Sequence, residues 1–373
     1  MHSKKRAKII NDPIYGFIEV DKGIINDLIN HKYFQRLRRI SQLGLSYLVY
    51  PGAQHTRFQH AIGSLHLINK ALNQLENKGH KISKQEKEGV KIAILLHDIG
   101  HCPFSHALER TIVTDISHEQ LTLIYMHKLN EKFNGKLSLA IKIFENKYER
   151  KFLNQLVSSQ LDMDRLDYLK RDSFFTGVTE GNIGVDRIIS MLDIKDDRLV
   201  IEEKGIYSIE KFIIARRLMY WQVYLHKTVL SAENMLIQIL NRAKYLYKNS
   251  KKIYLSPDLK RFFKNSFSFD DFIKDDSILE NFSRLDDYEI YACLKYWIKN
   301  EDFVLSNLSK KILDRNILKI RIQKTKFNKK IISKYRSNMM KKENINLNES
   351  KYFIFSKKVS NSLYSIHESN IKI

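Results

Sequence analysis

Residues 92–106 read Ile-Ala-Ile-Leu-Leu-His-Asp-Ile-Gly-His-Cys-Pro-Phe-Ser-His, so an apolar run leads directly into the pair His97-Asp98. His101 follows His97 by four residues, and on a helix both rings would lie on one face, one turn apart. A glycine and a proline follow, and we expect them to end or bend that helix and to place the polar cluster at its end. An adjacent imidazole and carboxylate there indicate either metal ligation or a satisfied internal hydrogen bond.

The distribution of histidines favours the metal. Nine of the thirteen histidines lie between His55 and His127. His60 and an acid from the Asp162/Asp164 region could join the His97-Asp98 pair and complete a set of imidazole and carboxylate ligands. Such a set suits a divalent transition metal or magnesium better than a metal that prefers thiolates.

The composition describes a globular protein of 373 residues, with either one large core or a large and a small domain. Thirteen glycines and four prolines leave long uninterrupted stretches, which favour helix. Two cysteines make no disulfide framework and indicate a reducing compartment. The basic N-terminus lacks the apolar segment of a signal peptide, and no apolar run approaches the roughly 20 residues that span a bilayer. We expect a cytoplasmic protein that does not bind membranes.

The net charge of +22 is unevenly distributed. Residues 310–342 contain thirteen Lys and Arg and a single acid, so this segment carries more than half of the excess. A positive surface attracts polyanions, either nucleotides or nucleic acid. A solvated basic face, or a general bias toward Lys, Asn and Ile, would explain the charge equally well.

The apolar spacing predicts a mainly helical chain. A turn with a short strand or hairpin is expected at residues 11–20, and a second hairpin at 198–207 with Gly205 at its turn. Alternating residues at 318–322 and 351–355 predict strands. A change of composition near residue 250 predicts two domains, 1–250 and 251–373. Helices are expected at residues 56–76, 84–98, 118–131, 137–147, 149–158 and 208–247.

Side chains suited to phosphate chemistry lie around the expected metal ligands. Imidazoles near neutral pKa can donate or accept the proton that phosphoester hydrolysis requires. The candidates for that role are His101, His106, Glu109 and His118. Arginine forks match phosphate geometry, although each arginine could equally form a surface ion pair. The candidates for binding a polyphosphate are Arg57, Arg165, Tyr168 and Arg216.

The order of these motifs resembles the HD-domain phosphohydrolases. More narrowly, it resembles the deoxynucleoside triphosphate triphosphohydrolase (dNTPase) branch, which includes the vertebrate SAM- and HD-domain dNTPase and bacterial dGTPase-like proteins. The similarity runs from about residue 10 to 240. The main supporting strings are Thr56-Arg-Phe-Gln-His60, His97-Asp-Ile-Gly-His101, Pro103-Phe-Ser-His106, Ser117-His-Glu-Gln120 and Asp162-Met-Asp-Arg-Leu-Asp-Tyr168.

The resemblance implies a mainly α fold, with an HD-domain helical core, short β-hairpins and a smaller α+β C-terminal lobe. It implies a divalent metal ion (Mg, Mn, Fe, Ni or Zn) on His60, His97, Asp98 and Asp164. It also implies that His101, His106 and His118 surround the α-phosphate and that Glu109 orients His118 as the proton donor. The implied phosphate contacts are Arg57, Arg165, Tyr168 and Arg216, and the implied sugar contacts are Gln42, Leu43, Asp172 and Tyr224.

The implied reaction converts a dNTP into a deoxynucleoside and inorganic triphosphate, in a homo-oligomer (dimer or tetramer) that a nucleotide can activate. The sequence departs from the family at three positions. Glu109 replaces an aspartate, and Arg165 replaces a lysine. At the activator site Gln35 and Arg38 match, but Asn30 replaces the acid that reads guanine. An amide cannot accept two N–H bonds as a carboxylate does.

Two other functions compete with this interpretation. One is an HD phosphohydrolase or nuclease that acts on another nucleotide or on a nucleic-acid phosphoester. The other is a non-enzymatic protein that binds nucleotides or nucleic acid through the basic segment 310–342. The second alternative requires an incomplete metal site, whereas all four ligand positions are present in the sequence.

Overall fold

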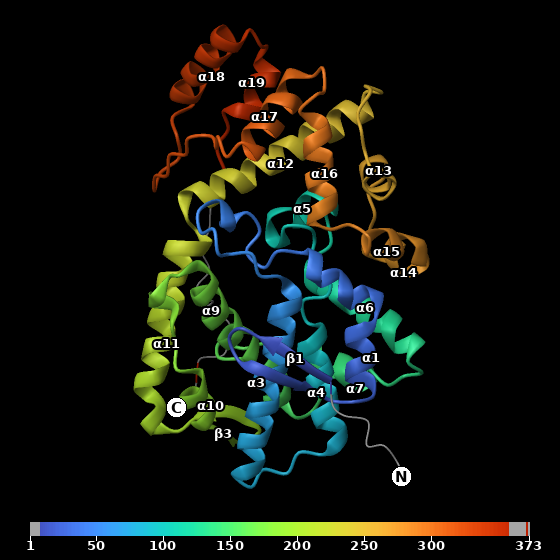
Figure 1. The fold of residues 1–373 in the computed structure, drawn as a ribbon, viewed down its shortest axis with the longest axis vertical. Coiled ribbons are helices and arrows are strands. Elements are labelled where there is room, and N and C mark those ends of the chain that lie inside the picture. Colours follow the sequence, from blue (N-terminus) through green and yellow to red (C-terminus); the bar gives the residue numbers. More distant parts are fainter. Residues whose placement is uncertain (1–7, 358–370, 372–373) are drawn as a thin grey trace.

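The computed structural model describes residues 8–357 and 371, and it is mainly α-helical, as predicted. Within these residues the strands form two small antiparallel hairpins (Figure 1). The first hairpin, β1 (Lys8–Asp12) with β2 (Gly16–Val20), confirms the prediction for residues 11–20. Its turn is closed by the Asp12 carboxylate, which accepts hydrogen bonds from the backbone N–H groups of Ile14 and Tyr15 at 2.9 and 3.1 Å.

Two buried helices, α3 (Arg57–Asn77) and α4 (Lys84–Leu96), form the centre of the core. Each starts at a capping box, Thr56 with Gln59 and Ser83 with Glu86, which satisfies the free N–H groups of its first turn. α3 packs on α4 and on α9 (Met163–Thr176), and α4 packs on α7 (Ser138–Phe144) and α8 (Lys151–Val157). Residues 92–96 are fully buried, so α4 delivers the His97-Asp98 pair into the interior.

Shorter elements complete this part of the fold. The chain after the His-Asp pair forms η3 (Ser105–Ala107) and α5 (Glu109–Ile112), and α6 (His118–Lys132) then returns to the core. Gly100 permits this return, because a Cβ there would lie 2.3 Å from the His118 carbonyl oxygen and 2.4 Å from the Thr122 nitrogen. The remaining short helices are α1 (Ile24–Asn30), α2 (Lys32–Gln35) and α10 (Val185–Ser190).

The second hairpin lies earlier in the chain than predicted. β3 (Leu192–Lys195) pairs with β4 (Arg198–Ile201) around Asp196 and Asp197, both of which have positive φ. Aspartate tolerates that conformation in a two-residue turn, so the aspartates make the turn rather than Gly205. Gly205 belongs to a 3₁₀ turn instead.

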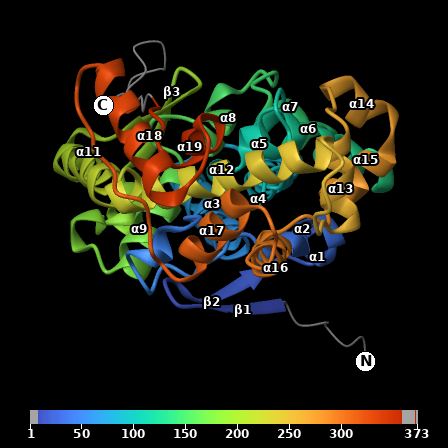
Figure 2. The same ribbon diagram turned by 90° about the horizontal axis from the view of Figure 1, so that it is seen from above.

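The predicted helix 208–247 is two helices. α11 (Ile206–Met219) continues into a π-helical turn at Tyr220–Tyr224, and α12 (Lys227–Lys248) then begins anew. The side chain of His226 accepts a hydrogen bond from the Thr228 N–H at 3.2 Å and so caps α12. α12 crosses the end of the core and separates it from α17 and α19 (Figures 1 and 2).

The described residues 251–357 contain helices and no strands, so the strands predicted at 318–322 and 351–355 are wrong. Residues 318–322 have no regular structure, and Ile320 and Ile322 are exposed, so their alternation has no buried face. Residues 351–353 belong to α19, which a capping box between Asn346 and Glu349 starts. The helices are α13 (Pro257–Lys264), α14 (Phe269–Lys274), α15 (Asp276–Phe282), α16 (Asp287–Trp297), α17 (Phe303–Leu313), α18 (Lys329–Glu343) and α19 (Leu347–Phe353).

The domain division at residue 250 stays a prediction, although α12 does end at Lys248.

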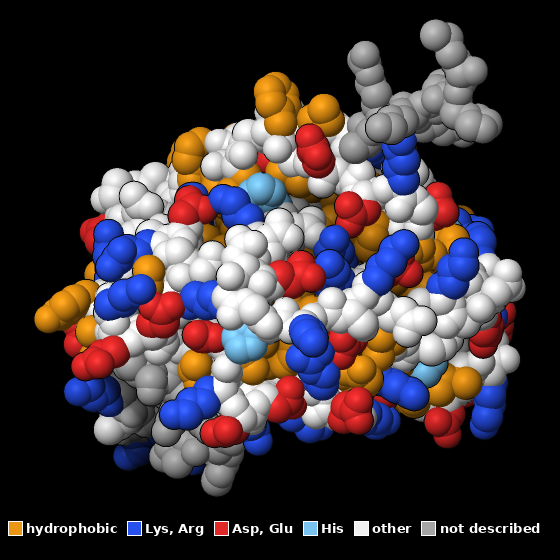
Figure 3. All heavy atoms as spheres, turned by 90° about the horizontal axis from the view of Figure 1, so that it is seen from below, with side chains coloured by type: hydrophobic (Ala, Val, Ile, Leu, Met, Phe, Trp, Pro, Cys, Tyr) orange, Lys and Arg blue, Asp and Glu red, His pale blue; other side chains and the backbone are white. Residues whose placement is uncertain are grey.

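Among the described helices, none is long and apolar enough to cross a membrane. Figure 3 shows one face of the molecule, where basic and acidic side chains are interspersed.

Candidate metal and phosphate site

The four predicted metal ligands converge from three helices. His60 comes from α3, His97 and Asp98 from the end of α4, and Asp164 from the first turn of α9. The Nε2 atoms of His60 and His97 are 3.2 Å apart. The Asp164 Oδ1 atom lies 3.1 Å from the first and 3.5 Å from the second. Asp98 is also adjacent, with carboxylate oxygens 3.6 Å from His60 Nε2 and 3.5 Å from His97 Nε2.

The outer ring nitrogens decide whether this arrangement fits a metal ion. His60 Nδ1–H donates to Asp167 at 2.7 Å, and His97 Nδ1–H donates to the Ile94 carbonyl at 2.6 Å. Each imidazole therefore turns its other nitrogen, Nε2, toward the centre, and in its neutral form it presents a lone pair there. Together with the Asp164 oxygen, these lone pairs need a cation between them, and the donor set suits a divalent metal.

A buried chain of ion pairs holds His60, and sequence reasoning missed it. Asp167 also binds Arg171 at 2.9 and 3.0 Å, and Arg171 reaches Asp12 of the N-terminal hairpin at 2.8 Å. Gly63 makes room for these groups, because a Cβ there would lie 2.0 Å from Asp167 Oδ1. The spacing of Asp167 and Arg171, i and i+4 on a helix next to Asp164, was the available signal.

The electrostatics of the centre favour a cation. Burial alone would raise the pKa values of Asp98 and Asp164, but Arg57 beside Asp98 and the two imidazoles beside Asp164 hold both well below their usual range. Burial opposes charge on His60, yet Asp164 and Asp167 raise its pKa to about 10. The site thus presents ionised carboxylates to whatever occupies it.

Arg57 links this centre to the next loop. Its guanidinium pairs with the Asp98 carboxylate, and its Nε donates to Ser105 Oγ at 2.7 Å. We expected Arg57 to bind phosphate. In the structure it is buried and bound to the carboxylate of Asp98, a predicted metal ligand.

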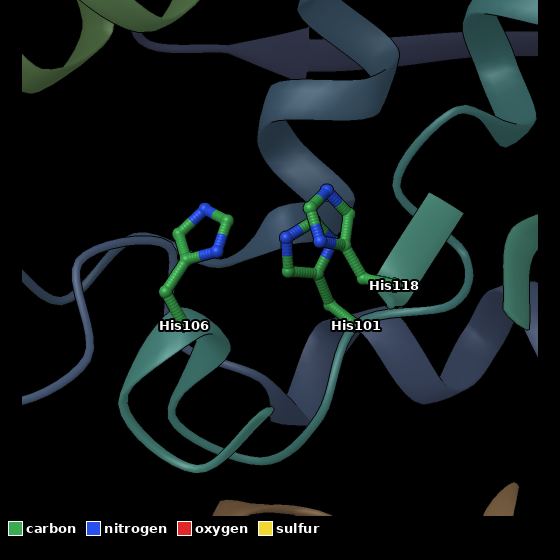
Figure 4. A group of neighbouring side chains, drawn as sticks. All are labelled: His101, His106 and His118. Carbon is green, nitrogen blue, oxygen red and sulfur yellow. The ribbon is translucent and has the colours of Figure 1, made fainter. Parts of the chain in front are cut away.

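The predicted acid–base residues form a second cluster (Figure 4). The ring centroids of His101 and His118 are 4.1 Å apart, and His106 lies across from them at 4.9 and 5.1 Å. Glu109 accepts hydrogen bonds from both the backbone N–H and Nδ1–H of His118, each at 2.8 Å. Burial holds the pKa of His101 well below its ordinary value, and its buried Nε2 has no hydrogen-bond partner. This cluster can accept an anion and deliver a proton.

Two of the predicted sugar contacts, Asp172 of α9 and Tyr224 of the π-helical turn, meet in the structure. Asp172 accepts a hydrogen bond from Tyr224 OH at 2.8 Å and contacts Nε2 of His55, which we had not predicted, at 2.7 Å. The Tyr168 ring lies between those of His60 and Tyr224, at centroid distances of 6.4 and 6.1 Å. Gln42 and Leu43 stand in the loop before η2 (Ser46–Leu48), and the buried Gln42 Oε1 has no hydrogen-bond partner.

The other two candidate phosphate ligands have partners in the structure. Arg165 forms an ion pair with Asp162, the N-cap of α9, and Arg216 Nη1 donates to Gln160 Oε1 at 2.9 Å. Burial raises the pKa of Asp162 to about 6, although the charge of Arg165 opposes the shift.

Comparison with known proteins agrees with this geometry. The HD domain model matches residues 57–172, and the HD associated region matches residues 183–254. The chain belongs to the HD-domain family. It is therefore a metal-dependent hydrolase of the HD phosphohydrolase type, with a candidate His/Asp metal site.

Individual relatives extend the similarity beyond the two matched regions. A phosphohydrolase from Bacteroides thetaiotaomicron is 53% identical and has a TM-score of 0.91, covering 93% of this chain and 86% of that one. The Bacillus subtilis protein YwfO is 33% identical over 83% of this chain and 71% of its own length. The Dictyostelium discoideum homologue of the dNTPase SAMHD1 is 32% identical over 67% of this chain. The chain spans only about half, 52%, of that relative.

Proposed function

We propose that this protein hydrolyses deoxynucleoside triphosphates at the α-phosphate. Water adds to the α-phosphorus and the bond to the 5′-oxygen breaks, which gives a deoxynucleoside and inorganic triphosphate. The observation that carries the proposal is the placement of a four-ligand His/Asp centre beside a cluster of three histidines. The similarity to proteins named dNTP triphosphohydrolases supports the substrate class.

The proposed metal ligands are His60, His97, Asp98 and Asp164. A divalent ion, when bound, would polarise the phosphoryl oxygen and lower the pKa of a water molecule. The outer bonds to Asp167 and to the Ile94 carbonyl keep both imidazoles oriented before the ion arrives.

The histidine cluster would bind the α-phosphate and supply the proton. His118 is the proposed donor to the 5′-oxygen, because Glu109 accepts its Nδ1–H and fixes the orientation of its ring. His101 and His106 face His118 and would contact the phosphoryl oxygens. Arg165, Tyr168 and Arg216 are the proposed contacts for the outer phosphates, with Arg57 at the metal-ligand carboxylate.

Discrimination against ribonucleotides would come from the sugar side. Asp172 is held by His55 and Tyr224, so it cannot swing away from a ribose 2′-hydroxyl without breaking those bonds. Gln42 and Leu43 are the proposed contacts on the opposite edge of the sugar.

We do not propose activation by guanine nucleotides, because both polar atoms of the Asn30 side chain are hydrogen-bonded within the protein. The Asn30 amide donates to the Asn26 carbonyl at 2.9 Å, and its oxygen accepts from Lys8 at 2.9 Å. The predicted homo-oligomer stays a prediction that light scattering can test.

The test is a nucleotide panel. Purified protein is incubated with each dNTP and each rNTP in magnesium, manganese and iron, with and without dGTP or GTP, and products are separated by ion exchange. We expect triphosphate and deoxynucleoside from dNTPs, without an added guanine nucleotide. Failure to hydrolyse any nucleotide, or release of pyrophosphate instead of triphosphate, would overturn the proposal.

Nucleic acid is the second candidate substrate, favoured by the basic segment 310–342. No residue of α18 is buried. Lys330, Lys334 and Lys341 share one helical face, and Lys342 shares another with Tyr335, which is 54% exposed. Lysines with an exposed aromatic suit single strands. Salt-dependent binding of single-stranded DNA or RNA, followed by metal-dependent cleavage, would support this candidate, and binding without cleavage would reject it.

A further inference from the structure

Asp287 lies outside both matched regions, yet its side chain reaches the active-site loops. It is the first residue of α16, and only 4% of it is exposed. One carboxylate oxygen accepts the backbone N–H of Ser41 at 2.8 Å, and the other accepts that of Phe104 at 2.6 Å. Ser41 immediately precedes Gln42, and Phe104 lies two residues before His106. One carboxylate therefore joins the proposed sugar loop to the proposed phosphate loop.

The phosphate loop needs such support because its backbone is strained. Phe104 and Ser105 have φ values of 55° and 56°, in the left-handed region that residues with a side chain rarely adopt. Such a conformation is unfavourable and persists only where neighbouring groups hold it. Two contacts from α16 hold Phe104 in place. The Asp287 carboxylate accepts a hydrogen bond from its N–H, and the Tyr291 ring packs edge-on against its ring at a centroid distance of 5.2 Å.

The strained turn is in turn coupled to the metal centre. Ser105 Oγ donates to the Ser41 carbonyl at 2.7 Å and accepts from Arg57 Nε at 2.7 Å. The Arg57 guanidinium then pairs with Asp98. A continuous series of hydrogen bonds therefore leads from Asp287 to a proposed metal ligand.

We infer that Asp287 is a positioning residue of the active site, which holds the loops 41–43 and 102–106 in the arrangement that catalysis needs. Its catalytic consequence rests on the proposed function, whereas its effect on the loops does not. A carboxylate is required because it offers two acceptor oxygens to two N–H donors. An asparagine offers only one, and would turn an N–H₂ group toward the second donor.

The neighbouring residue provides a matched control. Asp286 caps α16 by accepting the Glu289 N–H at 3.2 Å and pairs with Arg39. Asp286→Asn keeps the cap, since asparagine is a good N-cap residue, and makes the same chemical change one residue away. Neither Ser41 nor Phe104 loses a bond in this control.

The experiment compares Asp287→Asn, Asp287→Glu and Asp286→Asn with the wild type. Hydrogen exchange is followed by mass spectrometry in peptides covering residues 38–43 and 99–107, with residues 138–157 as the remote reference. dNTP turnover and thermal unfolding are measured on the same samples. We expect faster exchange in the two loop peptides of Asp287→Asn and unchanged exchange in Asp286→Asn. The kcat of Asp287→Asn should be lower by about 10- to 100-fold. Asp287→Glu keeps both acceptors and should recover part of each loss.

The outcomes separate the two proposals. Loop exchange in Asp287→Asn equal to that in Asp286→Asn would overturn the inference. Faster exchange with an unchanged kcat would overturn its catalytic part. A wild type that hydrolyses no dNTP would overturn the proposed function, while the exchange data would still decide whether Asp287 holds the loops. If Asp287→Asn does not fold, loop exchange in Asp287→Glu is compared with that in Asp286→Asn. Equal exchange in the two variants overturns the inference, and faster exchange in Asp287→Glu supports it.

Discussion

The metal centre and the histidine cluster lie side by side but are built differently. At the metal centre, His60 and His97 each have the outer nitrogen bound to a fixed acceptor, and the Asp167–Arg171–Asp12 chain extends that support to the N-terminal hairpin. At the cluster, Glu109 orients His118, but the buried His101 Nε2 has no partner, and His106 follows a strained turn.

This difference matches the roles that we propose for the two regions. A metal ion with a fixed coordination geometry binds most tightly to ligands that are already held in that geometry. A phosphate that arrives, reacts and leaves needs groups with unused hydrogen-bonding capacity. We therefore expect changes at the first region to alter metal content, and changes at the second to alter turnover with the metal retained.

The largest effect is expected at the metal ligands. His97→Ala or Asp98→Ala should abolish stoichiometric metal binding and lower turnover by about 1,000-fold or more, because the charge stabilisation supplied by an ion is worth several kcal/mol. Elemental analysis and product assays measure both. His80→Ala, which removes a surface histidine bound to Asp193, is the control and should change neither. Retention of the metal by His97→Ala would contradict the assignment of His97 as a metal ligand.

The next effect separates chemistry from metal binding. His118→Gln should lower kcat by about 100- to 1,000-fold through loss of the proton donor, while the metal content stays that of the wild type. Glu109→Gln should have a smaller effect in the same direction. The exposed His127→Gln is the control. Metal loss in His118→Gln would assign His118 to the metal centre.

A third change weakens the metal centre without touching a ligand. Asp167→Asn removes the charged acceptor of His60 Nδ1–H and should weaken metal affinity by about 10- to 100-fold. Asp193→Asn makes the same change beside His80 at the surface and should leave affinity unaltered. Competition with a chelator measures the affinities, and equal values in the two variants would contradict the support we assign to Asp167.

A smaller effect concerns the sugar side. Tyr224→Phe removes one hydrogen bond to Asp172 and should reduce the preference for dNTPs over rNTPs by about 3- to 10-fold. The ratio of kcat/KM values for dATP and ATP measures it. An unchanged ratio would show that the hydrogen bond from Tyr224 to Asp172 does not contribute to the preference for dNTPs.

The smallest effect is on stability and depends on pH. Burial raises the pKa of Glu233 on α12 to about 7, although Lys357 opposes the shift. Between its ordinary pKa and about pH 7 the folded protein binds more protons at Glu233 than the unfolded chain, so its contribution to stability falls as pH rises. Glu233→Gln should thus gain about 2 °C in Tm over the wild type at pH 8 and little at pH 5. A gain in Tm that does not depend on pH would exclude the titration of Glu233 as its cause.

Local patterns predicted the helices of the core, because these depend on residues close in the chain. The order of the family's motifs predicted that His60, His97 and Asp164 converge, and the structure brings them together. Their role as metal ligands stays a prediction. Asp287 was not predicted, because it meets Phe104 across 183 residues and no local pattern marks that contact. The C-terminal strands failed for a related reason: alternation predicts a strand only where one face becomes buried, and Ile320 and Ile322 stay exposed.

The most direct test of the account is hydrolysis of a dNTP in ¹⁸O-labelled water. Attack at the α-phosphorus puts the label into inorganic triphosphate and leaves the deoxynucleoside unlabelled, and mass spectrometry distinguishes the two. We predict one ¹⁸O atom in triphosphate from the wild-type protein and none from His97→Ala. Label in the deoxynucleoside, or in orthophosphate or pyrophosphate released as the first product, would contradict the account.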